Sequence, residues 1–153
     1  MGFLEMIYFG HCNKTSPFLE GVMNCPKCVS PLSEIAIENV CLDFCPGCKG
    51  IWFDKDEVAF VTELKNDLPN PQAERTVGRP TGFPCPRCEA KLEELKFVPL
   101  LDLLVDRCPT CHGLWLDNGE LHKVGTIAAD FKTPKSRVVR VALQIKLKSG
   151  GFF

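Results

Sequence analysis

Eight of the ten cysteines in this 153-residue chain form four Cys-x-x-Cys pairs. The pairs make two sets, within which 16 and 19 residues separate one pair from the next. Four thiolates suit a tetrahedral ion such as zinc at ~2.3 Å, and two intervening residues let one turn aim both sulfurs of a pair at the same ion. The spacing therefore predicts two sites, each holding one Zn²⁺, with iron as the alternative metal. The predicted ligands are Cys25, Cys28, Cys45 and Cys48 in the first site, and Cys85, Cys88, Cys108 and Cys111 in the second.

These predicted sites are closed. Four sulfur ligands leave no open position for water or substrate, which predicts structural sites rather than catalytic ones. No Ser-His-Asp set, phosphate-binding loop or Cys-His nucleophile arrangement accompanies them in the sequence. His112 adjoins Cys111, but Lys49 holds the equivalent place in the first set, which favours an exposed spacer over a ligand. We therefore expect no enzyme and no small-molecule substrate.

Two other uses of paired cysteines have to be weighed. A secreted disulfide scaffold is disfavoured because residues 1–10 have no basic n-region and carry Glu5 within their short apolar run. The default is therefore a reducing cytoplasm. The segment Cys45-Pro-Gly-Cys48 alone resembles a dithiol redox site, but three sister pairs accompany it and no βαβ pattern surrounds it. A rubredoxin-like iron protein or a dithiol redox protein remains an alternative, which the colour of the purified protein tests.

The second half of each set opens a longer repeat. Its pattern, Cys-Pro-x-Cys-x-Gly-x-Trp-x-Asp-x-x-Glu, runs from Cys45 to Glu57 and returns from Cys108 to Glu120. Each unit spans about 45 residues, near the size below which a hydrophobic core alone seldom suffices. The sequence thus predicts a small metal-stabilised α+β protein of two tandem zinc ribbons. Each ribbon would be an antiparallel β-hairpin plus a short strand, followed by a short capped helix.

The elements of the first unit follow from its apolar spacing. Apolar residues alternate over 35–44 around a turn at residues 38–39, and residues 51–53 form a short apolar run. A helix is expected over residues 55–65. Four acidic residues fit capping boxes rather than catalytic pairs, with the aspartate accepting from exposed amides and the glutamate reaching back. These residues are Asp54 and Glu57 in the first unit, and Asp117 and Glu120 in the second.

Two further repeated residues have expected structural roles. We call each Cys-x-x-Cys pair with its turn a knuckle. Gly50 and Gly113 lie two residues after the second knuckle of each set, where glycine permits the backbone to fold back under the metal. Trp52 and Trp115 stand two residues later. An exposed indole can stack on a nucleic-acid base. We favour a core position for both, covering the ribbon and meeting the apolar face of the helix, because small metal domains need large side chains to bury.

Composition divides the chain into five parts. Residues 66–83 hold three prolines and two glycines, which block regular structure and predict a semi-rigid connection. The predicted parts are an N-terminal extension that is weakly ordered or non-native over 1–22, zinc ribbon 1 with its helix over 23–66, a Pro/Gly linker over 67–83, zinc ribbon 2 with its helix over 84–129, and a basic tail over 130–153.

The distribution of charge along the chain indicates which kind of partner the protein binds. Residues 23–70 hold 4 basic and 8 acidic side chains, whereas a nucleic-acid binder usually carries positive charge on its folded face. The tail is basic, and it either stays solvated or adds a strand to a sheet edge. No apolar run approaches the ~20 residues of a membrane span. The candidate contacts to nucleic acid or a protein partner are Lys132, Lys135, Arg137, Arg140, Lys146 and Lys148.

The repeated motif resembles the transcription factor IIB-type zinc-ribbon family, found widely in small prokaryotic proteins. The match is carried by Cys25 to Glu57 and by Cys85 to Leu121, including an aspartate two residues before the third cysteine of each set. The resemblance implies zinc held by the eight cysteines and a link to transcription. The chain departs from the family in the extra segments at both ends, the lack of a glycine after the first knuckles, and its non-basic ribbons.

Three functions are thus carried forward. The first is a zinc-binding protein-interaction module in the cytoplasm, linked to transcription. The second is a nucleic-acid-binding protein that uses the basic tail with the ribbons. The third is the iron or dithiol redox protein.

Overall fold

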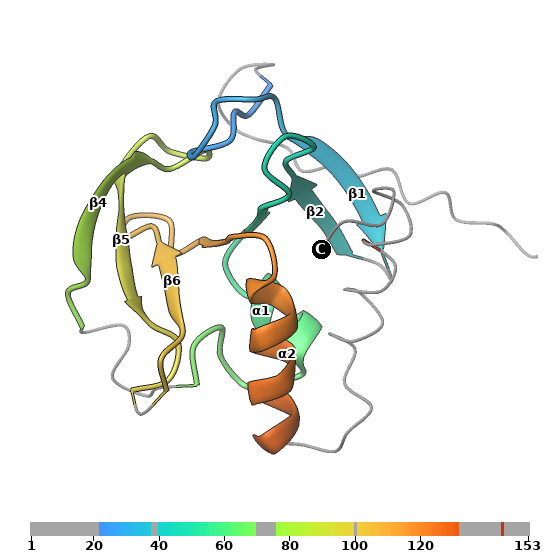
Figure 1. The fold of residues 1–153 in the computed structure, drawn as a ribbon, viewed down its shortest axis with the longest axis vertical. Helices are drawn as coiled ribbons and strands as arrows, with labels where there is room; N and C mark the ends of the chain where they lie inside the picture. Colours follow the sequence, from blue (N-terminus) through green and yellow to red (C-terminus); the bar gives the residue numbers. More distant parts are fainter. Residues whose placement is uncertain (1–21, 38–39, 70–75, 100, 132–144, 146–153) are drawn as a thin grey trace, which may run out of the picture.

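The computed structural model describes residues 22–37, 40–69, 76–99, 101–131 and 145 (Figure 1). Both halves show the predicted ribbon, in which a hairpin is followed by a short strand and then a helix. The first half contains β1 (Ser33–Ile37), β2 (Val40–Phe44), β3 (Ile51–Phe53) and α1 (Glu57–Thr62). The second contains β4 (Arg79–Pro84), β5 (Lys91–Lys96), β6 (Leu104–Arg107), β7 (Leu114–Leu116) and α2 (Glu120–Phe131).

The two ribbons join in one seven-stranded antiparallel sheet. Its strand order is β1-β2-β3-β7-β6-β5-β4, so the short last strands of the two ribbons, β3 and β7, meet near the centre. In that pair Trp52 lies opposite Trp115, with Ile51 opposite Leu116 and Phe53 opposite Leu114. The two equivalent tryptophans face each other and the flanking pairs are reciprocal, so an approximate two-fold axis relates the ribbons across this junction of β3 and β7, the seam. The tandem repeat predicted two ribbons, but nothing in it predicted that they would share a sheet.

Strand β4 occupies part of the segment predicted to be an irregular linker. It begins at Arg79, and its pairing with β5 shifts register between Pro80 and Pro84. Proline cannot donate to a ladder, but an edge strand leaves one row of amides unused, so prolines are tolerated there. Gly82, with φ 80°, supplies the left-handed residue at the irregularity. The prediction that proline and glycine exclude regular structure is therefore wrong for residues 79–83.

Helix α1 is shorter than the predicted span of residues 55–65. It begins at Glu57 because Asp56 has a φ of 70°, and it ends at Thr62 because Glu63 is again left-handed, at 59°. Within it, the Thr62 hydroxyl donates to the carbonyl of Val58 at 2.6 Å. Helix α2 has twelve residues and is the longer of the two. In the described residues no helix has the length and apolar character needed to cross a bilayer.

The sheet buries both of its faces. The main core lies on one face, where the hairpins of both ribbons meet the helices, represented by Val58 and Val61 of α1 and Leu121 and Val124 of α2. The two helices contact each other, and Figure 1 shows them between the strands β4–β6 and the strands β1 and β2. The opposite face carries a second cluster built from the two tryptophans and the metal-site cysteines.

Of the predicted tail over 130–153, the structure describes residues 130 and 131, at the end of α2, and Ile145. Ile145 is 1 % exposed and belongs to the main core. The six basic residues predicted as contacts lie outside the described residues, as do residues 1–21 of the predicted extension and the hairpin turn at 38–39.

Candidate metal centres

The structure brings the eight predicted cysteines together in the two predicted sets. In each set the four Sγ atoms lie within 4.8 Å of one another. Around a tetrahedral ion with ligands at ~2.3 Å, neighbouring sulfurs are about 3.8 Å apart. Each set therefore has the dimensions of a single four-coordinate site. Four Sγ–Sγ distances are 3.5 Å for Cys25–Cys48, 3.4 Å for Cys28–Cys45, 3.6 Å for Cys85–Cys111 and 3.4 Å for Cys88–Cys108.

All four knuckles share one backbone conformation. The residue after the second cysteine of each pair is left-handed, with φ of 65°, 67°, 63° and 62° at Val29, Lys49, Glu89 and His112. In each knuckle the amide of the first cysteine donates to the carbonyl five residues later, as from Cys45 to Gly50 at 2.9 Å. The first knuckles, which lack the following glycine, therefore have the same backbone geometry as the second knuckles.

Backbone amides point at the sulfurs. The amides of Lys27 and Cys28 lie 3.3 and 3.4 Å from Cys25 Sγ, and the amide of Cys48 lies 3.4 Å from Cys45 Sγ. A hydrogen bond to a thiolate favours its charged form and orients the ligand. The same arrangement recurs in ribbon 2, where the amide of Arg87 lies 3.3 Å from Cys85 Sγ.

The thiols of each set do not ionise alike. The sulfurs of Cys85 and Cys111 share a hydrogen bond, which lowers the pKa of Cys111 to about 5 and raises the pKa of Cys85. Burial raises the pKa of Cys25, and it raises the pKa of Cys108 to about 11. Four thiolates crowded together repel one another, so such a set suits a divalent cation that replaces the protons and neutralises the charge.

The glycines have a different role from the predicted one. Gly50 and Gly113 do not have the left-handed conformation, which falls one residue earlier, at Lys49 and His112. An added Cβ at Gly50 would lie 2.2 Å from Cζ2 of Trp115, and one at Gly113 would lie 2.0 Å from Cζ2 of Trp52. Glycine is therefore required because a tryptophan of the other ribbon packs directly on each knuckle.

Both tryptophans are buried, as predicted, but they cover the metal sites rather than the helices. Trp52 and Trp115 are 0 % exposed and lie in the cluster that contains the cysteines. Their indole N–H groups donate to Asp54 at 2.9 Å and to Asp117 at 2.8 Å. Neither ring is accessible for stacking on a nucleic-acid base.

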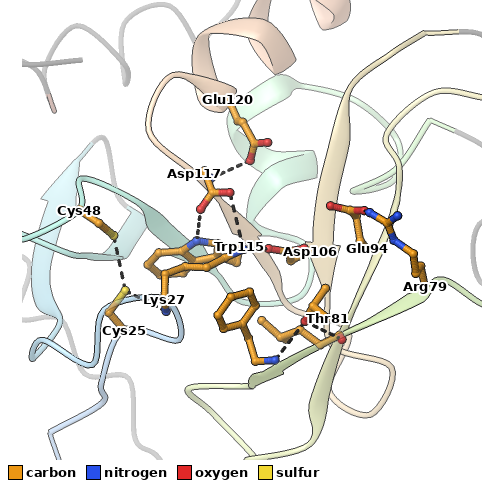
Figure 2. Close-up of polar contacts among 12 residues, drawn as sticks. Cys25, Lys27, Cys48, Arg79, Thr81, Glu94, Asp106, Trp115, Asp117 and Glu120 are labelled. Atoms are coloured by element: carbon orange, nitrogen blue, oxygen red, sulfur yellow. Dashed lines mark hydrogen bonds and ion pairs between the residues drawn. The ribbon is translucent and has the colours of Figure 1, made fainter.

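Charged residues cross between the ribbons at the same seam. Lys27, in the first knuckle of ribbon 1, lies 2.6 Å from Asp106 and 3.7 Å from Asp117 of ribbon 2. Figure 2 shows these side chains gathered beside Trp115. Burial lowers the pKa of Lys27, but the hydrogen bond to Asp106 together with the negative charges of Asp106, Asp117 and Glu120 raises the pKa above its ordinary value. Burial raises the pKa of Asp106, which Lys27 only partly offsets.

The equivalent position in ribbon 2 repeats this contact in the opposite direction. Arg87 donates from Nε to Asp54 Oδ1 at 3.0 Å and from Nη2 to Asp54 Oδ2 at 2.8 Å. The same Nη2 lies 3.6 Å from Asp43, which is 1 % exposed. Asp43 and Asp106 stand opposite Trp52 and Trp115 in their sheet registers. The seam therefore presents a buried row of Asp, Trp, Trp and Asp, closed at each end by a cation from the other ribbon.

The predicted capping boxes are only half present. Glu57 accepts from the amide of Asp54 at 2.8 Å, and Glu120 accepts from the amide of Asp117 at 2.6 Å. The contacts of the two aspartate carboxylates are with the tryptophan indoles and with Arg87 and Lys27. The prediction that Asp54 and Asp117 cap the helices with their side chains is therefore wrong, because their carboxylate oxygens bind groups at the seam.

Sequence reasoning missed the residue that does satisfy the start of α1. Asp67 accepts from the amide of Asp56 and from the amide of Ala59, each at 2.7 Å. It lies after the helix, in the predicted linker, and no local pattern connects it with the helix start. Its interaction depends on the chain turning back after Glu63, which the spacing of apolar residues does not reveal.

Among the described residues, the two cysteine sets are the groups with the geometry of a metal site. His112 and His122 are exposed and belong to neither set.

A family model described as transcription factor zinc-finger matches residues 24–59 and 84–126, which together cover just over half of the chain. The two matched segments contain the two cysteine sets and both seam strands. The chain therefore belongs to this TFIIB-type zinc-ribbon family, as the repeated motif indicated. A search of curated proteins and a search of solved structures find no match.

Proposed function

We propose that this zinc-ribbon protein binds one Zn²⁺ in each four-cysteine site and acts as an interaction module for a protein partner in an assembly linked to transcription. The observation that carries the proposal is the closure of both sites. Four sulfurs within 4.8 Å of one another fill a tetrahedral coordination sphere and leave no place for a substrate. The ions would then hold the fold, and we expect no catalysis at either site.

The choice of zinc rests on the family and on the ligands. Four thiolates suit zinc, and the matched family is a zinc-ribbon family. Four sulfurs also suit iron, which makes a rubredoxin-like redox protein the alternative. Metal analysis of the purified chain separates the two, since a zinc protein is colourless and an iron protein is red. Sites of this kind need reduced cysteines, which supports a cytoplasmic location.

A protein partner is favoured over nucleic acid by what the ribbons leave exposed. Lys27 and Arg87 are engaged with aspartates of the opposite ribbon, and both indoles are buried. The charge of ribbon 1 is mostly acidic, with 8 acidic and 4 basic residues in 23–70, Lys27 included. Such a surface is poorly suited to phosphate contacts.

The proposal is tested by affinity capture with metal-loaded protein, before and after nuclease treatment. We expect proteins of the transcription apparatus to be captured and to survive nuclease. Capture that nuclease abolishes, together with a salt-dependent mobility shift lost on deleting residues 132–148, would instead establish nucleic-acid binding through the tail.

A further inference from the structure

We propose that the two metal sites load cooperatively, because each knuckle loop carries the cation that neutralises a buried aspartate of the opposite ribbon. The inference rests on the proposed binding of metal and goes beyond it, since two separate four-cysteine sites on one chain need not influence each other. Each cysteine set lies within one ribbon, so any coupling must pass through the contacts between the two ribbons.

The position of Lys27 depends on the two metal ligands that flank it. It stands between Cys25 and Cys28, and its own amide lies 3.3 Å from Cys25 Sγ. A metal ion that binds both sulfurs therefore fixes the backbone on either side of Lys27. Without an ion, nothing covalent holds these sulfurs together, and the loop regains the freedom that ordering removes. Metal in ribbon 1 thus positions a cation that points into ribbon 2.

The ammonium group of Lys27 contacts a buried carboxylate of ribbon 2. The Nζ of Lys27 lies 2.6 Å from Asp106, whose side chain is 6 % exposed, and 4.3 Å from the centre of the Phe83 ring. Asp106 stands two residues before the ligand Cys108, on the strand that leads into the second knuckle of ribbon 2. A carboxylate buried without its partner is costly, so an ordered Lys27 favours the conformation that brings Cys108 to its site.

Arg87 of ribbon 2 makes the reciprocal contact. Arg87 stands between Cys85 and Cys88 and makes two hydrogen bonds to Asp54, at 3.0 and 2.8 Å. Its guanidinium also lies 3.6 Å from Asp43, two residues before the ligand Cys45. Metal in ribbon 2 therefore orders a cation that stabilises ribbon 1. Coupling between two binding sites is necessarily reciprocal, and here the contacts themselves run in both directions.

The tryptophans strengthen the link. The added-Cβ distances of 2.2 Å at Gly50 and 2.0 Å at Gly113 show that each indole packs directly on a knuckle of the other ribbon. An unloaded, disordered knuckle removes the surface on which the opposite tryptophan packs. Each site therefore supports the burial of Trp52 or Trp115 in the partner ribbon, in addition to the ion pairs.

The test is a Zn²⁺ titration of the full chain in the presence of a competing chelator, followed by native mass spectrometry. The method counts chains with no metal, one ion and two ions. Independent sites leave at least about half of the chains with one ion at half saturation, whereas the usual coupling of about 5- to 150-fold lowers this share to between about a third and under a tenth. We expect a share below one third.

A charge-neutral variant tests the route of the coupling. Lys27→Met combined with Asp106→Asn removes the ion pair without leaving a buried charge, and we expect the one-ion share to rise toward half. The matched control is Arg79→Met with Glu94→Gln, which removes an ion pair between β4 and β5 within ribbon 2. This control should keep the wild-type distribution.

The outcomes separate the two proposals. A chain that takes up no metal contradicts the proposed function itself. A chain that takes up two ions, with half or more of the molecules carrying one ion at half saturation, keeps the proposed function and overturns the coupling. The titration of the wild-type protein tests the coupling between the two sites even where a variant fails to fold. Cooperative loading would give the interaction module an all-or-none response to zinc.

Discussion

Replacing Gly50 with alanine should drive the two ribbons apart, although residue 50 lies in ribbon 1 and the obstacle lies in ribbon 2. The new methyl group would lie 2.2 Å from Cζ2, 2.8 Å from Cε2 and 3.0 Å from Cη2 of Trp115. That indole is 0 % exposed, and its N–H donates to Asp117 at 2.8 Å, so it cannot move aside without losing a hydrogen bond.

The magnitude follows from the overlap. Overpacking a well-filled core costs about 1 to 3 kcal/mol, and a contact this short places Gly50→Ala at the upper end, about 3 kcal/mol. At roughly 2 to 4 °C per kcal/mol for a chain of this size, the melting temperature should fall by about 6 to 12 °C. Thermal unfolding of the metal-loaded protein, followed by circular dichroism, measures the change.

A double-mutant cycle identifies the cause. Trp115→Phe removes the ring atoms that the methyl group meets, so Gly50→Ala should cost at least about 1 kcal/mol less in that background. Gly82→Ala is the control, because Gly82 has a φ of 80° and no atom within 4 Å of an added Cβ. Its cost comes from backbone strain and should be the same with either residue at position 115. Equal costs for Gly50→Ala in both backgrounds would refute the packing of Trp115 on this knuckle.

Three further predictions concern charged residues. Lys27→Met leaves Asp106 buried beside no cation and should cost about 3 to 5 kcal/mol in denaturant unfolding; adding Asp106→Asn should recover most of this loss, and no recovery would contradict the ion pair. Burial raises the pKa of Glu120 from 4.5 to about 7, so its ionisation destabilises the folded state. With metal saturating, wild type should lose stability relative to Glu120→Gln as pH rises from about 4.5 to 7, and parallel curves would contradict the burial of this carboxyl. Asp67→Ala removes the acceptor of two amides at the start of α1 and should cost about 0.5 to 2 kcal/mol, whereas an unchanged melting temperature would show that this cap does not contribute.

The local parts of the structure could be predicted from the sequence because short-range geometry determines them. Two residues between paired cysteines suffice to aim both sulfurs at one point, and all eight ligands are found in the predicted sets. The alternation over residues 35–44 gave the correct pairing of β1 with β2. The glutamates of both capping boxes accept from the expected amides.

The contacts between the ribbons were not predictable in the same way. The sequence shows Gly50 and Trp52 two residues apart, which suggests a role within one knuckle. The glycine in fact accommodates Trp115, and Trp52 packs on Gly113. Similarly, Asp54 and Asp117 fit a helix cap locally, whereas their carboxylates serve the indoles and the crossing cations. A repeat shows that two units are alike, but it does not show that the units pack against each other.

The most direct test of closed metal sites is X-ray absorption at the zinc edge, combined with metal analysis of the intact chain. The proposed function predicts two zinc ions per chain, each with four sulfur neighbours at ~2.3 Å and no lighter neighbour in the first coordination shell. Oxygen or nitrogen in that shell would mean an open site with room for chemistry, and iron in place of zinc would favour a redox protein. Either result would contradict a structural role for the two four-cysteine sites as zinc centres.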